Sequence, residues 1–213
     1  MGVSGGSGAG RSANVFIVAI LATISLAVAN VIAANSFVDQ AQPLGRTLST
    51  IIIFGDQYDG GDELYDARIT VVQVVRGEKA WEMLKAISTS NPAPKAGFEY
   101  LLARVRFEFS ARTSPSHYNY TIDEAQFTAM KADGTAYAAP SIAEEPMPDL
   151  QGTLKPGNSL EGWITFAVPR ADRQPLMLFR ADVGSVIHEG SGSLFKLYVG
   201  SPEAGRPSRQ NQN

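Results

Sequence analysis

Cysteine is absent from all 213 residues of the chain. Its absence excludes disulfide bonds, thiolate metal sites, a cysteine nucleophile and a lipid-modified cysteine. A folded domain in this chain must therefore be stabilised by the burial of its apolar side chains alone.

Positive charge is also scarce, because 18 lysines and arginines are outnumbered by 21 aspartates and glutamates, and the net charge is −3. Proteins that bind phosphate backbones need a broad basic surface. The chain has no basic run that could supply one. We therefore expect no nucleic acid among its partners.

Histidine, the most frequent general base, occurs only as His117 and His188. Neither lies in a pattern that indicates a hydrolytic triad. A G-x-S-x-G match at residues 2–6 lies in a glycine- and serine-rich tail, without the preceding strand and following helix that a nucleophile elbow requires. We therefore predict no catalytic residue, no cofactor and no enzymatic activity.

An uncharged apolar run, VFIVAILATISLAVANVIAA, occupies residues 15–34. About twenty residues at a rise of 1.5 Å each cover the bilayer's hydrocarbon core of roughly 30 Å, so the run predicts a transmembrane anchor. The flexible tail of residues 1–14 carries Arg11, whereas the first charge after the run is Asp39. The positive-inside rule then places the tail in the cytoplasm and the rest of the chain outside.

A cleaved signal peptide is the alternative, because small residues at 27 and 29, and again near 31–33, offer weak cleavage sites. The apolar region of a signal peptide usually runs for about 7–15 residues, and the longer run here favours an uncleaved anchor. Both interpretations export residues 35–213. The first describes a single-pass membrane protein with an extracytoplasmic domain, and the second a secreted protein.

The exported part predicts a linker at residues 35–45, an all-β domain at residues 46–200 and a disordered polar tail at residues 201–213. In LLARVRFEFS, apolar side chains alternate with charged ones, which is typical of a strand with one buried face. The predicted strands are residues 47–54, 68–75, 98–110, 124–130, 160–168, 176–181 and 194–199. Seven such runs indicate an antiparallel β-sandwich.

One helix interrupts these strands at residues 78–87, where Ala80, Trp81, Leu84 and Ile87 follow helical spacing. NPAP ends the helix, and we expect it to form a crossover between two strands of the sandwich. KADG at residues 131–134 predicts a hairpin turn, and the prolines that follow it predict a long loop.

Four segments in the same order resemble a known family: ITVVQVVRGEKAWEMLKAISTSNPAPKAGFEYLLARVRFEF, FTAMKADGTAY, LKPGNSLEGWITFAVP and the closing SLFKLYV. They are similar to the bacterial telokin-like, immunoglobulin-like family whose members carry only a domain-of-unknown-function label. The resemblance extends to a small secreted mycobacterial antigen. It implies an exported or membrane-anchored immunoglobulin-like sandwich, but no activity and no catalytic residue.

The glycine-rich segment GDQYDGGDELYD at residues 55–66 contains Asp56, Asp59 and Asp62, and carboxylates in a flexible loop are ligands that calcium accepts. Its spacing matches no known calcium loop, so we expect a solvated acidic loop and no metal site. A hydrolase or metal-dependent enzyme remains the alternative function. It requires Asp59 or Asp62 in a pocket beside His117 or His188.

Aromatic residues anchor many protein interfaces. In SPSHYNYTI, Tyr118 and Tyr120 are the candidates for an exposed contact patch, whereas Trp81 and Trp163 are expected in the core. Together these features predict an exported, membrane-tethered binding or accessory module. Its expected partners are the membrane and a protein.

Overall fold

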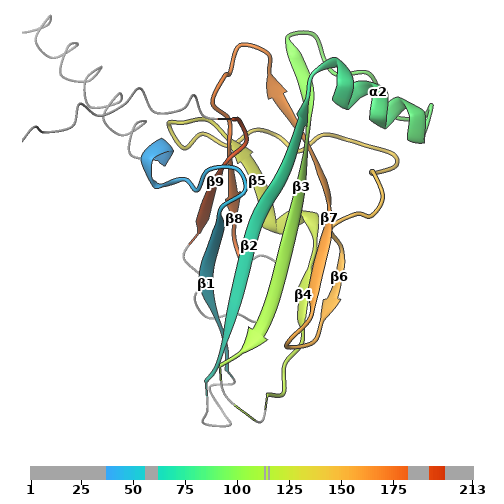
Figure 1. Ribbon diagram of the computed structural model, residues 1–213. Helices are drawn as coiled ribbons and strands as arrows, with labels where there is room; N and C mark the ends of the chain where they lie inside the picture. Colours follow the sequence, from blue (N-terminus) through green and yellow to red (C-terminus); the bar gives the residue numbers. More distant parts are fainter. Residues whose placement is uncertain (1–36, 56–61, 113, 115, 182–191, 200–213) are drawn as a thin grey trace, which may run out of the picture.

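The computed structural model describes residues 37–55, 62–112, 114, 116–181 and 192–199 (Figure 1). The described strands are β1 (Thr47–Phe54), β2 (Glu63–Arg76), β3 (Phe98–Ala111), β4 (Tyr120–Ile122), β5 (Phe127–Met130), β6 (Gly152–Leu154), β7 (Ser159–Pro169), β8 (Leu176–Phe179) and β9 (Ser193–Lys196). They are joined by the helix α2 (Glu78–Ile87) and the 3-10 turn Glu124–Gln126.

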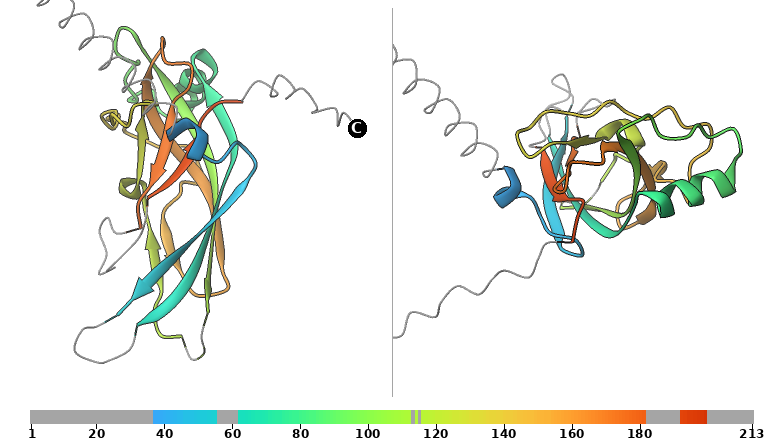
Figure 2. Two further views of the ribbon diagram at one scale, coloured as in Figure 1. Left: turned by 90° about the vertical axis from the view of Figure 1, so that its left-hand side faces the viewer. Right: turned by 90° about the horizontal axis from the view of Figure 1, so that it is seen from above.

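The strands form two layers around one core, with α2 outside them (Figure 2). The first layer is the sheet β1-β2-β3-β7, and the second contains the pair β4-β6 and the sheet β5-β8-β9. All pairings between these strands are antiparallel. The all-β antiparallel sandwich predicted from the alternating pattern is therefore confirmed.

Strand β3 shows how the alternation builds the core. Phe107 and Phe109 point inward and are 0% and 1% exposed. On the opposite face, Arg104 and Arg106 form salt bridges of 2.7 Å with Glu161 of the neighbouring strand β7. The alternation of apolar and charged residues along β3 thus gives the strand one buried face and one solvent-exposed face, as the sequence predicts.

Strand β2 is longer than predicted and carries a bulge between Val71 and Gln73. Before the bulge, Ile69 and Val71 lie in the core between the layers. After it, Val75 joins a second apolar cluster on the outer face. One extra residue reverses the alternation, so β2 supplies apolar side chains to both faces of its sheet.

Helix α2 has the predicted bounds and packs Ala80 and Leu84 into this outer cluster. The other buried members of the cluster are Val75, Tyr100, Leu102 and Trp163. The predicted crossover is wrong, however, because α2 connects β2 and β3, which are adjacent antiparallel strands of one sheet. The helix therefore sits within a hairpin connection.

The predicted linker is also partly wrong, because residues 37–45 pack onto the domain. Ala41 is 3% exposed. The N–H of Gln42 donates to the carbonyl of Leu194, and the N–H of Lys196 donates to the carbonyl of Gln42, both at 2.8 Å. The domain consequently begins before residue 46.

The predicted tail at 1–14, the anchor at 15–34 and the tail at 201–213 lie outside the described residues. In the part of the chain that the structure describes, no helix is long and apolar enough to cross a membrane.

Candidate functional site

The acidic segment differs from its predicted form. Asp56 and Asp59 lie outside the described residues, and Asp62 is exposed just before β2. Residues 63–66 are not loop but the start of β2, paired with the end of β1. Within the described residues, no group of three or more histidines and carboxylates could hold a metal ion.

His117 contacts Glu63 rather than Asp62, which the alternative enzyme would require beside it. The carboxylate of Glu63 accepts the Tyr65 hydroxyl at 2.5 Å and the His117 backbone N–H at 3.0 Å, and it also contacts the His117 ring. These bonds, with that from Tyr65 first, lower the pKa of Glu63 to about 2. Glu63 is thus a weak base that ties β2 to the segment before β4. His188 lies outside the described residues.

The predicted contact patch of Tyr118 and Tyr120 is wrong. Tyr120 is 0% exposed, and its ring stacks on Phe107 with centroids 5.1 Å apart. Tyr118 is half-buried and stacks on Phe54 at 5.0 Å. Both rings belong to the packing at this end of the sandwich.

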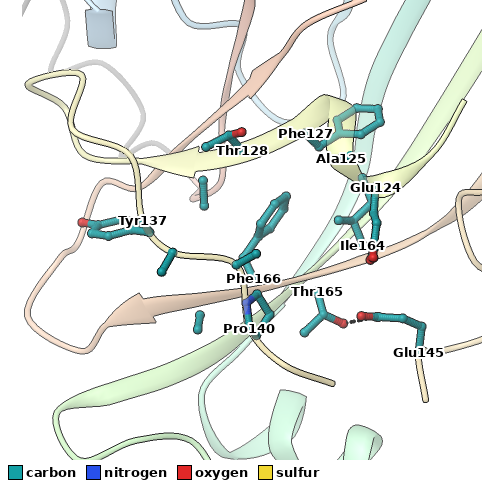
Figure 3. A pocket seen from close by; sticks show the side chains of 14 residues that line it. Glu124, Ala125, Phe127, Thr128, Tyr137, Pro140, Glu145, Ile164, Thr165 and Phe166 are labelled. Carbon is teal, nitrogen blue, oxygen red and sulfur yellow. Dashed lines mark hydrogen bonds between the residues drawn. The ribbon is translucent and has the colours of Figure 1, made fainter. Parts of the chain in front are cut away.

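Two adjoining hollows lie on either side of residues 137–140, and neither was predicted. The inner hollow has a volume of about 320 Å³ and lies between β5 and β7 (Figure 3). It is lined by Glu124, Ala125, Phe127, Thr128, Ala129, Tyr137, Ala138, Ala139, Pro140, Glu145, Ile164, Thr165, Phe166 and Ala167. Phe166 and Ile164 make its floor apolar, and Glu124 and Glu145 place carboxyl groups at its side.

The carboxyl group of Glu145 accepts a hydrogen bond from the Thr165 hydroxyl (Figure 3). Burial raises the pKa of Glu145, although the Thr165 bond opposes the shift, and the charges of Glu124 and Asp149 raise it further. The inner hollow therefore disfavours another negative charge and accepts neutral, apolar groups.

The outer groove has a volume of about 470 Å³ and lies on the other side of residues 137–140. It is lined by Pro92, Ala93, Pro94, Lys95, Phe98, Tyr100, Lys131, Thr135, Ala136, Tyr137, Ala138, Ala139, Pro140, Ser141, Ala167 and Pro169. Among the described residues, neither Lys95 nor Lys131 forms a salt bridge. The groove thus combines an apolar wall with two ammonium groups.

One wall of the groove is the proline-containing loop after α2, which two buried side chains hold in place. The Tyr100 hydroxyl donates to the Pro92 carbonyl at 2.9 Å. Asn91, 4% exposed, donates to the carbonyls of Leu84 and Glu144, both at 2.9 Å. The wall is therefore fixed to the helix on one side and to the long loop on the other.

A tyrosine shared by both hollows is fixed as well. The hydroxyl of Tyr137 donates to Asp172 Oδ2 at 2.5 Å, and burial followed by this bond raises the pKa of Tyr137. The hydroxyl therefore stays protonated. Its ring remains a stationary divider between the inner hollow and the outer groove.

Sequence reasoning missed these hollows because their walls come from distant segments. The signal that could have found them is the cluster of prolines and alanines in NPAPKAG and TAYAAP, which leaves space beside the large rings of Phe98 and Tyr100.

Comparison with known proteins adds a family but no activity. No curated protein matches the chain. A solved structure titled "putative lipoprotein (ycdA)", from Bacillus subtilis, is similar with a TM-score of 0.44 and 13% identity over 61% of this chain. The match spans only 36% of that protein's chain. The family model described as "Domain of unknown function (DUF4352)" matches residues 64–186, more than half of the chain, which therefore belongs to this family.

Proposed function

We propose that this chain is an exported, membrane-tethered binding module without catalytic activity, and that its binding site is the inner hollow together with the outer groove. The observation that carries the proposal is the composition of the groove, an apolar concavity with two lysines that have no salt bridge among the described residues. Concave apolar surfaces with a few polar groups are typical of binding sites.

The side chains that line the two hollows do not favour a catalytic function. Neither lining contains a histidine. The raised pKa of Glu145 is accounted for by burial, to which the charges of Glu124 and Asp149 add. A hydrolase built on His117 is also poorly supported, because Glu63 already accepts three hydrogen bonds from Tyr65 and His117.

The tether is proposed from the apolar run at residues 15–34, whose length suits a single membrane span. Secretion after signal cleavage is the alternative. The finer relationship to telokin-like, immunoglobulin-like domains and to a secreted mycobacterial antigen belongs to this proposal too, and rests on the four ordered sequence segments.

Site-specific photo-crosslinking tests the binding site. A photoreactive amino acid replaces Ala138, which lines both hollows, in cells that make the full chain. The matched control replaces Ser49, an exposed position on β1. Strand β1 lies at one edge of the four-stranded sheet, and β7, which lines both hollows, lies at the other. We expect a discrete adduct from position 138 that Lys95→Glu with Lys131→Glu removes. Equal adducts from both positions would contradict the proposed site.

Cell fractionation tests the tether. The full chain should require detergent for extraction, and N-terminal sequencing should find residues upstream of Val15. A mature chain that begins near residue 35 and dissolves in buffer would decide for secretion.

A further inference from the structure

Strand β7 has a free edge beside the two hollows. At Trp163, the backbone N–H donates to the Pro148 carbonyl at 2.8 Å, and the carbonyl accepts from Leu150 N–H at 3.2 Å. Both groups of Trp163 therefore point away from β3. Because backbone groups alternate along a strand, those of Thr165 and Ala167 point to the same side.

The pairing with β3 gives the same orientation independently. The N–H of Arg170 donates to the Gly97 carbonyl at 2.9 Å, which brackets Phe98 and Pro169 as a pair without mutual hydrogen bonds. Because such pairs recur at every second residue, Ala167 and Thr165 also make no backbone hydrogen bond to β3. Four backbone groups thus face the open edge.

These four groups have no hydrogen-bond partner among the described residues. Thr165 is 4% exposed, and only its side chain is bonded, to Glu145. Residues 138–140 line both hollows together with Ala167, but they make no hydrogen bond to β7. Buried backbone groups are nearly always paired in native proteins, so this edge is prepared for a partner.

The two hollows lie on opposite faces of the position that a further strand would take. The inner hollow contains Ile164 and Phe166, which belong to the core between the layers. The outer groove contains Tyr100, from the cluster outside the sheet. Side chains of a strand alternate between its faces, so a strand bonded to β7 would place successive residues in one hollow and then the other.

We propose that the free edge of β7 at Thr165 and Ala167 binds an extended peptide segment of a partner protein, which adds to the sheet as a strand. The inference rests on the proposed binding function and names its partner. Strand addition obtains affinity from backbone hydrogen bonds and selectivity from alternate side-chain pockets, and this edge offers both.

The charges select the peptide. Lys95 and Lys131 at the outer groove favour an acidic residue on that face. Glu124 and Glu145 at the inner hollow disfavour one and leave the apolar floor to a small neutral side chain. We therefore expect a segment that alternates apolar and acidic residues.

Selection from a library of randomised heptapeptides on the full chain in detergent micelles provides the probe. The selected peptides should alternate as described. Their affinity is then compared for Ala167→Pro and Ala167→Ser. Proline removes an N–H that points to the open edge, so it costs no bond to β3, whereas serine keeps that N–H.

Ala167→Pro should weaken binding by about tenfold or more, as expected for the loss of a backbone bond and the approach that it needs, while Ala167→Ser stays within about twofold. Hydrogen exchange at the Thr165 amide should slow in the complex. Unchanged affinity in a folded Ala167→Pro variant, unprotected Thr165, or a library without binders would each overturn strand addition.

Two further arms keep the outcome clear. If Ala167→Pro does not fold, peptides that are N-methylated at alternate amides replace it, and only one of the two methylation registers should abolish binding. If the crosslink from position 138 persists in a folded Ala167→Pro variant, the binding site stands and strand addition is rejected. Equal adducts from positions 138 and 49 in the otherwise wild-type chain would instead reject the proposed function.

Discussion

Replacing Asn91 by alanine should destabilise the domain far more than a surface substitution does. The side chain makes four hydrogen bonds: its Nδ2 donates to the carbonyls of Leu84 and Glu144, and its Oδ1 accepts the N–H groups of Ala143 and Glu144 at 2.9 and 3.0 Å. It therefore joins the last turn of α2 to the long loop that precedes β6.

The magnitude follows from these bonds. Each contributes about 0.5–1.5 kcal/mol net, so four bonds give roughly 2–6 kcal/mol. Water can reach Ala143 and Glu144, which are exposed, and recovers part of the loss there. We expect Asn91→Ala to lower the free energy of unfolding by about 2–4 kcal/mol.

Urea denaturation of the purified full chain measures this loss as a lower midpoint with an unchanged slope. Asn119→Ala is the matched control, because Asn119 is exposed and should change the free energy of unfolding by less than about 0.5 kcal/mol. A loss below about 1 kcal/mol for Asn91→Ala would show that the loop is not held through this side chain. The same variant should weaken peptide binding, because Asn91 precedes the groove wall.

Phe107→Ala should cost about 3–5 kcal/mol, since Phe107 is fully buried, whereas Arg106→Ala on the opposite face should cost less than about 1 kcal/mol; equal midpoints would show that the strand faces are wrongly assigned. Gly162→Ala should destabilise by about 1–3 kcal/mol or more, because its Cβ would lie 2.3 Å from the Asp149 carbonyl oxygen; an unchanged melting temperature would contradict this close approach. Glu145 has a folded pKa above the ordinary value of 4.5, so the native state binds more protons and stability falls as pH rises from 4.5 through the raised pKa. Glu145→Gln should remove that fall in denaturation midpoints measured across pH, and a parallel pH profile would refute the assignment. Micromolar calcium should give no heat in calorimetry on the full chain, and a melting temperature that rises strongly with calcium would overturn this expectation.

Local patterns predicted those elements whose burial follows a simple period. The bounds of α2 follow from its helical spacing and the prolines after it, and the faces of β3 follow from strict alternation. Both patterns are long enough to be read without knowing the neighbouring elements.

Other predictions failed where tertiary contacts decide. Tyr120 lies in a short polar stretch in which nothing local indicates that Phe107 will cover it. The acidic appearance of residues 63–66 concealed a strand, because its inward residues, Tyr65 and Ala67, alternate with charged ones over a short distance. The binding hollows depend on β5, β7 and the loop after α2, which approach one another only in the folded chain.

The bulge in β2 has a consequence for how the chain tolerates changes in length. The part of β2 before the bulge packs its side chains into the core between the layers, and the part after the bulge packs Val75 into the outer cluster under α2. Deleting Val72 would restore a regular ladder but would rotate one of these parts by half a turn and expose its apolar side chains. The spacing between Val71 and Val75 should therefore stay invariant among relatives.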